Sequence, residues 1–405
     1  MKRMLRSPSP KVQLTIHIFV ALLTIGFMVV ILRHQRQPEP VVINKAPISV
    51  ADLEKKYVSH CRDEKCVMEA SRTMTDIAGV ANAIGALQIF ESAPRSTYVG
   101  DPHLWAHEAG SEAALKYGLT GKEFIKCPET FNYGCSHGFM EVVVQRSPSI
   151  NAAIQSVCGQ IENSPQYSLK KKYYCYHGAG HGVLQTYDYD LTKSLAICDS
   201  LLTYIGHAGC WQGVFMEGDL AANEGEAPPG IFADKGHPIA PCDTVAEKYQ
   251  YQCFINLPGR IIEMENADVP ASIADCMLAA SDDNRKTCLQ GLGIVIGGDR
   301  WQELHSIYKG DTLQGTAWKY CQLFPVDYLD SCIFGALSEI LNVDMFNVVR
   351  PIAFCGLVYD AHKPWCYQTL GSLLRSQSAS EPIVAKECSM VPASSQADCR
   401  KGARL

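Results

Sequence analysis

The sequence predicts an all-α protein: an α-solenoid of helical hairpin repeats cross-linked by disulfides and preceded by one transmembrane helix. Three observations lead to this class. The 18 cysteines fall into close couples along the chain after residue 50. From Cys135 on, the second members of these couples recur every 33 to 44 residues, the length of a helical hairpin. Segments between couples, such as CIFGALSEIL at 332–341, repeat apolar residues with the period of an α-helix.

The first fifty residues contain one segment that fits a membrane-spanning helix. Residues 14–32 form a run of 19 almost wholly apolar positions, a length that crosses the hydrocarbon core as a helix. No small-residue cleavage site follows Leu32, so we interpret the segment as an uncleaved anchor rather than a signal peptide. The expected organisation is a tail at 1–13, an anchor at 14–32, a linker at 33–50 and a repeat domain at 51–405.

Cysteine usage indicates where the repeat domain lies. All 18 cysteines follow the predicted anchor, their number is even, and no CxxC motif occurs. Disulfides in an oxidising compartment explain this pattern better than clusters of reduced thiols on metal. We therefore expect a single-pass membrane protein with a cytoplasmic amino terminus. The bulk of the chain would lie outside the cytoplasm, in a periplasm, at a cell surface or in a secretory lumen.

The charge distribution argues against a nucleic-acid partner. Residues 1–45 carry a balance of +6 and the whole chain −6, which leaves −12 for the remainder. Nucleic-acid binding requires a basic surface, so this class is excluded. The membrane is the expected partner of the amino-terminal helix.

The close couples predict the disulfide pairing. Bonds within each couple use every cysteine, whereas bonds from the start of each unit to its own end leave Cys61 and Cys399 single. We favour the close couples, which are Cys61–Cys66, Cys127–Cys135, Cys158–Cys175, Cys198–Cys210, Cys242–Cys253, Cys276–Cys288, Cys321–Cys332, Cys355–Cys366 and Cys388–Cys399.

Each unit is expected to hold a first helix that begins near a couple and a second helix that ends at the next. The segment 147–158 illustrates a second helix, with Ser147 as its expected cap. Cys66 and Cys135 lie 69 residues apart, about twice the period, so one unit without cysteines is placed between them. We count that unit from Asp101, the expected N-cap of its first helix.

Alignment of the units on their leading cysteine reveals a repeated glycine. The third following position is glycine in six units, at Gly138, Gly178, Gly213, Gly291, Gly335 and Gly402. Glycine costs a helix interior roughly 1 kcal/mol, so its recurrence on one face needs a reason. The pattern predicts that the backbone of a neighbouring helix approaches this face closely.

The second and sixth positions carry the residues that indicate chemistry. They read His137/Glu141 and His177/His181 in two adjacent units, and His103/His107 in the unit counted from Asp101. Residues four apart share a helical face, and stacked first helices lie about 8–10 Å apart, so these side chains would form one ladder. Imidazole and carboxylate together suit zinc, iron or copper. We predict one or two transition metal ions within units at about 101–190, held by His103, His107, His137, Glu141, His177 and His181.

A packing role is the alternative for this ladder, because Gln212, Gln290 and Gln368 occupy the second position in other units. Met216 and Glu217 continue the ladder into the next unit and would cap the site. The YDYD stretch at 187–190 is expected as a turn and helix cap that could rim a pocket. Paired ligands on adjacent helical repeats resemble the HEAT-type di-iron hydroxylases, whose His-Glu dipeptides are matched here by His107-Glu108 alone.

Three functions are compatible with these features. The first is a metal-dependent hydrolase or oxygenase outside the cytoplasm, with no catalytic acid or base identifiable beyond the ligands. The second is a non-catalytic scaffold that binds a protein or peptide ligand on the solenoid surface. A metal-binding or delivery protein is a third, for which Met140 and Met216 would suit copper.

Overall fold

The computed structural model describes residues 48–93, 99–298, 312–343 and 347–405. The chain divides into two units, Met1–Ile48 and Ser49–Leu405, and the helices from α2 onward belong to the second. The predicted anchor at 14–32 lies outside the described residues. Within the described ranges, no helix is both long enough and apolar enough to cross a bilayer.

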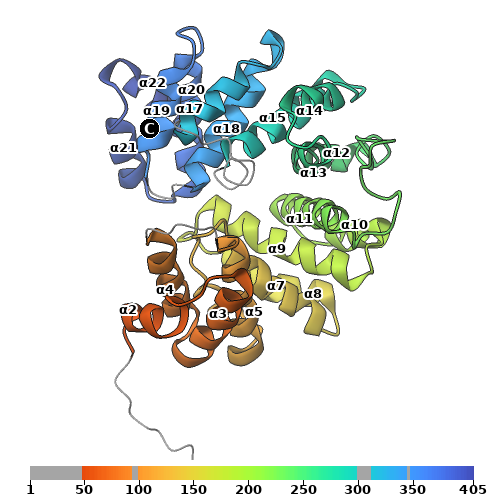
Figure 1. The fold of residues 1–405 in the computed structure, drawn as a ribbon, viewed down its shortest axis with the longest axis vertical. Helices are drawn as coiled ribbons and strands as arrows, with labels where there is room; N and C mark the ends of the chain where they lie inside the picture. Colours follow the sequence, from red (N-terminus) through yellow and green to blue (C-terminus); the bar gives the residue numbers. More distant parts are fainter. Residues whose placement is uncertain (1–47, 94–98, 299–311, 344–346) are drawn as a thin grey trace, which may run out of the picture. The chain divides into compact units, whose positions relative to one another are not determined.

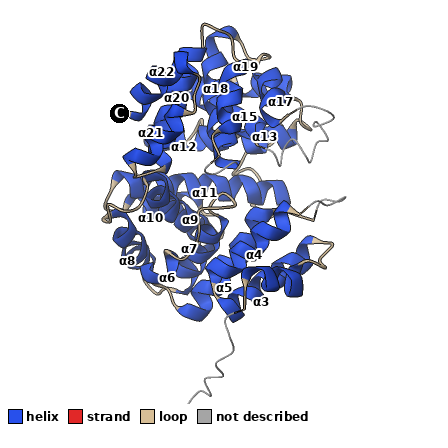
Figure 2. Cartoon of the chain, turned by 90° about the vertical axis from the view of Figure 1, so that its left-hand side faces the viewer, coloured by secondary structure: helices blue, strands red, loops and turns tan. Residues whose placement is uncertain are grey.

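Helices make up all the regular structure of the described residues, and Figure 2 shows no strand among them. The all-α class is thus confirmed for this part of the chain. The chain opens with α2 (Val50–Leu53) and the π-helix η1 (Glu54–Val58), and two short 3-10 turns, η2 (Val326–Tyr328) and η3 (Ala393–Ser395), occur later.

The remaining helices fall into two groups. Those that carry or follow the second cysteine of a couple are α3 (Glu64–Ala78), α7 (Gly134–Arg146), α9 (Leu169–Thr186), α11 (Tyr204–Glu224), α12 (Glu247–Asn256), α15 (Asp282–Gly297), α18 (Leu329–Val343), α20 (Lys363–Gln377) and α22 (Gln396–Ala403), together with α5 (Pro102–Tyr117), which has no cysteine. The intervening helices are α4 (Val80–Ser92), α6 (Gly121–Phe124), α8 (Ile150–Glu162), α10 (Leu191–Asp199), α13 (Pro258–Met264), α14 (Val269–Cys276), α17 (Leu313–Cys321), α19 (Val349–Leu357) and α21 (Glu381–Ser389).

Nine disulfides join the members of the close couples, as the spacing predicts. The bond between Cys158 of α8 and Cys175 of α9 is typical, with 5.6 Å between its Cα atoms. That separation is ordinary for a disulfide. Because all cysteines lie in the described ranges and none is free, the cross-links account for every thiol.

The first helices of successive units pack against one another in chain order, from α3 through α5, α7, α9 and α11 to α22 (Figure 1). Some contacts depart from this order, and the first is that α9 also packs against α20. Near it, Lys170 of α9 donates to the side chain of Asn342 on α18, and Asn132 donates to Glu339 at 3.2 Å. A repeat array in which units contact only their neighbours would lack these interactions.

The close approach predicted from the glycines is present. A Cβ atom at Gly213 of α11 would overlap the carbonyl oxygen of His177 on α9. The same relation joins three other third-position glycines to the preceding first helix, namely Gly291 to Ile255, Gly335 to Gln290 and Gly402 to Gln368. Glycine at this position therefore sets the spacing at which side chains of adjacent first helices meet.

The unit without cysteines has a different register from the one predicted. Gly138 faces the carbonyl of His107, not that of His103, so His107 stands at the second position of its unit. Trp105 then takes the place of the leading cysteine. Ser71, five residues after Cys66, supports this register by donating to the Trp105 carbonyl at 2.7 Å.

The predicted register was wrong by four residues, or about one helical turn. A shift of one turn leaves the same face of the helix presented, so the sequence pattern alone looks the same in both registers. Asp101 is the N-cap of α5, as expected, and accepts from the backbone N–H of His103 at 3.0 Å. That cap lies one turn before the position that aligns with the cysteines.

The expected cap at Ser147 is also wrong. Ser147 ends α7, whereas α8 begins at Ile150 with Ser149 before it and runs beyond Cys158 to Glu162. Pro148 disfavours helical geometry at the residue that precedes it, which separates Ser147 from the helix that follows.

Candidate metal centre

Three buried histidines from two neighbouring helices converge at the crossing of α7 and α9. His137 comes from α7, and His177 and His181 come from α9 one turn apart. The ring centroid of His137 lies 4.9 Å from that of His177 and 5.1 Å from that of His181. Gly178 of α9 packs directly on the backbone of His137, and this contact brings the three rings together.

The Nδ1 atoms of the two α9 histidines already have acceptors on α11. His177 Nδ1 lies 3.1 Å from Gln212 Oε1, and His181 Nδ1 lies 2.9 Å from Glu217 Oε2. An amide oxygen and a carboxylate accept hydrogen bonds, so both rings carry their proton on Nδ1. In the neutral form of each ring the lone pair then lies on Nε2, and these two Nε2 atoms are 3.1 Å apart.

His137 is oriented through His103 of α5. His103 Nδ1 lies 3.0 Å from the carbonyl oxygen of Phe131, which can only accept, and His103 Nε2 lies 3.2 Å from His137 Nδ1. The proton of His137 is thereby placed on Nδ1. Its Nε2 is buried and has no hydrogen-bond partner, in a residue that is 2% exposed. An orphaned buried acceptor of this kind requires an explanation.

An unusual backbone segment presents the Phe131 carbonyl. Phe131, Asn132 and Tyr133, which lead into α7, all have positive φ angles of 55°, 49° and 63°. Non-glycine residues in this region carry strain, which persists only where the surrounding structure holds it. The strained turn thus coincides with the hydrogen bond that orients His103.

These contacts leave three imidazole lone pairs in one place. One ring nitrogen each from His137, His177 and His181 lie within 4.8 Å of one another. Two ligand atoms on one tetrahedral ion, each about 2.0–2.1 Å from it, lie about 3.3 Å apart, close to the His177–His181 separation. Facing lone pairs repel, and a cation between them relieves the repulsion. These three side chains therefore could hold a metal ion.

Electrostatics keep the rings of His137 and His177 neutral, which metal binding requires. Burial, together with the neighbouring imidazoles, holds the pKa of His137 and of His177 well below the ordinary value of a histidine. Burial lowers the pKa of His103 to about 4.

A second group adjoins the first and shares His181. One ligand atom each from Glu141 of α7, His181 and Glu217 of α11 lie within 4.8 Å of one another. His107 Nε2 lies 3.0 Å from Glu141 Oε1. Burial alone would lower the pKa of His107, but the carboxylates of Glu141, Glu217 and Glu108 together outweigh it and raise the pKa. Burial alone would raise the pKa of Glu217, but His181, Gln185 and His107 together outweigh it and lower the pKa.

The six residues predicted as ligands thus lie side by side, but they have different roles. His137, Glu141, His177 and His181 belong to the two groups, while His103 orients His137 and His107 pairs with Glu141. Glu217 was expected only as a cap, and Gln212 was given a packing role. Both residues reach the histidines because α11 stacks on α9, a contact that the glycines predict. Glu217, however, stands one residue past the sixth position of its unit.

Glu108, the second residue of the His-Glu dipeptide, does not reach either group. Its carboxylate accepts from Arg72 of α3 at 2.5 Å. The one dipeptide that matches the HEAT-type di-iron hydroxylases therefore contributes no carboxylate to the centre. Comparison with known proteins gives no further likeness, because no family model, curated protein or solved structure matches this chain.

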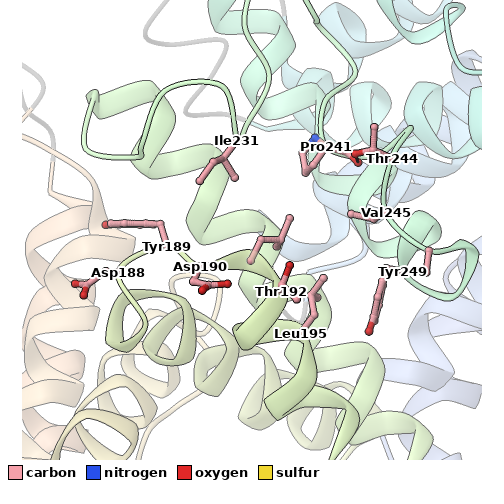
Figure 3. Close-up of a pocket in the computed structure, with 12 residues that line it drawn as sticks. Asp188, Tyr189, Asp190, Thr192, Leu195, Ile231, Pro241, Thr244, Val245 and Tyr249 are labelled. Atoms are coloured by element: carbon pink, nitrogen blue, oxygen red, sulfur yellow. Dashed lines mark hydrogen bonds between the residues drawn. The ribbon is translucent and has the colours of Figure 1, made fainter.

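A cavity of about 680 Å³ lies beyond the end of α9 (Figure 3). Figure 3 shows Asp188, Tyr189 and Asp190 along one side and Tyr249 at the other, with Ile231 and Pro241 above. Asp190 is the N-cap of α10, so the YDYD stretch forms both the expected turn and a pocket rim. None of the residues in the two groups lines this cavity.

Proposed function

We propose that this chain is a metal-dependent hydrolase that holds one zinc ion on the Nε2 atoms of His137, His177 and His181. The observation that carries the proposal is the orphaned Nε2 of His137, buried beside the two Nε2 atoms of α9 that have no donor facing them. Neutral imidazole is a preferred ligand of zinc, and the Nδ1 partners on each ring match the way zinc proteins orient their histidines.

The number of ligands favours catalysis over a structural role. Structural zinc sites are closed by four protein ligands, whereas catalytic sites use three and leave a position for water. An ion on three neutral imidazoles keeps its full charge and lowers the pKa of bound water towards neutrality. Glu141 and His107 lie at the edge of the cluster with side chains 12% and 22% exposed, and this edge offers water an approach.

The copper-delivery alternative has less support. The Met140 sulfur lies 4.0 Å from the Cys158 sulfur, on the side of α7 that packs against α8. A thioether in that place packs against a disulfide rather than the imidazoles. The scaffold alternative has one clear consequence, which is a protein that folds identically without metal and gains no stability from it.

The proposal also includes an extracytoplasmic location and a membrane anchor. Nine disulfides indicate an oxidising, extracytoplasmic environment. We place residues 14–32 in the membrane with the amino terminus in the cytoplasm, and we interpret the ordered packing of first helices as a solenoid. A protein or peptide ligand on its surface belongs to the scaffold alternative.

Elemental analysis of the full chain, produced in an oxidising compartment, tests the proposal. We expect at least one equivalent of zinc in the wild type and its loss from the tri-histidine position in His137→Ala. The control His237→Ala removes a half-exposed histidine that pairs with Asp243 and should change nothing. Zinc-free wild-type protein, with an unfolding temperature unmoved by added zinc, would contradict the proposal. Zinc-dependent turnover on ester, amide and phosphoester substrates then separates a hydrolase from a carrier.

A further inference from the structure

Two carboxylates lie close together beside the tri-histidine cluster, and each pairs with a histidine. The side chains of Glu141 and Glu217 are 12% and 11% exposed, and one oxygen of each lies within 4.8 Å of the other. No lysine or arginine of the described ranges forms an ion pair with either. Like charges this close in a partly dry site repel strongly, and a cation between them is the usual remedy.

Nitrogen donors lie at the same place. His181 Nδ1 is 2.9 Å from Glu217 Oε2, and His107 Nε2 is 3.0 Å from Glu141 Oε1. One imidazole and two carboxylates form a donor set that transition metal ions bind in proteins. His181 is 3% exposed and presents one nitrogen to each group, so its ring lies between the two positions.

We propose that the protein binds a second divalent metal ion through Glu141, Glu217 and Nδ1 of His181, with His181 bridging the two ions. This inference rests on the proposed function, because the first ion occupies the Nε2 side of the same ring. On binding of the second ion, the Nδ1–H bond of His181 breaks and the proton leaves to solvent. The nitrogen lone pair then bonds to the metal, so that the ring becomes an imidazolate with one ion on each nitrogen.

The two positions can be separated by single substitutions. Glu141 belongs only to the second group and His137 only to the first. We expect two equivalents of zinc in the wild-type full chain and one in each of Glu141→Gln and His137→Ala. Glu108→Gln is the matched control, because Glu108 is bound to Arg72 and should leave both equivalents in place.

The bridge has its own readout. Two copper(II) ions joined by one imidazolate couple magnetically, so the copper-loaded wild type should lose most of its EPR signal at low temperature. Glu141→Gln, with one ion, should recover the signal of an isolated copper. Two equivalents with the full signal of uncoupled ions would overturn the bridge.

Stoichiometry distinguishes the failure of this inference from that of the proposed function. A single equivalent in the wild type that persists in Glu141→Gln overturns the second ion and leaves the tri-histidine centre standing. A wild type that binds no metal overturns both. Circular dichroism of each variant shows that a lost equivalent reflects a lost ligand rather than a lost fold.

Discussion

The Nε2 atoms of His177 and His181 face each other at 3.1 Å, although both rings donate their Nδ1 protons to acceptors on α11. A packing ladder of neutral imidazoles would avoid this arrangement, because it brings two lone pairs together without a proton between them. The third Nε2, that of His137, has no partner at all. This geometry supports the proposed metal centre, because these three side chains could hold one ion.

The amide that orients His177 should matter for metal affinity. Gln212→Ala removes the acceptor of His177 Nδ1, and we expect zinc to bind about 10–100-fold more weakly, as is usual when such a partner is lost. Gln290 occupies the same position in α15, away from the histidines, so Gln290→Ala is the control. Competition with a chromophoric chelator measures both affinities, and equal values for the two variants would show that the Gln212 contact is incidental.

The glycine at the crossing of α9 and α11 should link packing to the centre. A methyl group at Gly213 would overlap the His177 carbonyl, so we expect Gly213→Ala to cost about 1–3 kcal/mol of unfolding free energy and to weaken zinc binding. Gly291→Ala meets the Ile255 carbonyl in the same way and should cost a similar amount without touching metal affinity. Urea titration measures the first quantity. A stabilised Gly213→Ala protein would mean that the helices are not in close contact.

Disulfides far from the centre should affect stability alone. Cys355→Ser/Cys366→Ser opens a loop of 11 residues, and chain entropy gives an expected loss of about 3 kcal/mol. Zinc content should stay at the wild-type value. Measurement of both in one preparation checks the claim, and loss of metal in this variant would indicate that the whole array, not the local cluster, sets the site.

Stability should rise with pH in the alkaline range because of a buried lysine. Lys171 donates to the Cys127 carbonyl at 2.6 Å, and burial lowers its pKa to about 8. Below about pH 8 the lysine is charged in both the folded and unfolded chain, and the penalty of burying that charge is constant. Between about pH 8 and about 10 the unfolded chain holds more protons, so the free energy of unfolding increases, by up to about 3 kcal/mol.

Lys171→Met should remove this part of the pH dependence. Lys170, whose pKa burial also lowers to about 8, should keep another part of it. Lys193→Met is the control, because Lys193 is 68% exposed and pairs with Asp190. Unfolding free energies across the alkaline range test the sign, and a wild-type stability that falls between about pH 8 and about 9 would contradict it.

The features that recur in many units could be predicted from the sequence, because a pattern found in several units rarely arises by chance in each. Cysteine spacing was enough for the helical class and for all nine bonds, and the glycines predicted the close helix approach that the backbone of His177 and Gly213 shows. The unit at α5 has no cysteine to fix its alignment with the others, and its predicted register was wrong by about one helical turn.

The roles of individual site residues depend on contacts between helices that spacing does not encode. His103 fell in the ladder by count, yet its Nδ1 bonds to a carbonyl that a left-handed turn presents. Glu217 stands one residue beyond the expected position and still reaches His181 at 2.9 Å. Such side-chain partners can be identified only in the folded structure.

Diffraction from crystals of the zinc-loaded full chain, recorded on both sides of the zinc absorption edge, tests the tri-histidine centre most directly. We expect an anomalous peak at about 2.0–2.1 Å from the Nε2 atoms of His137, His177 and His181. Absence of any peak there, with a protein group or ordered water bonded to His137 Nε2 instead, would contradict the metal centre.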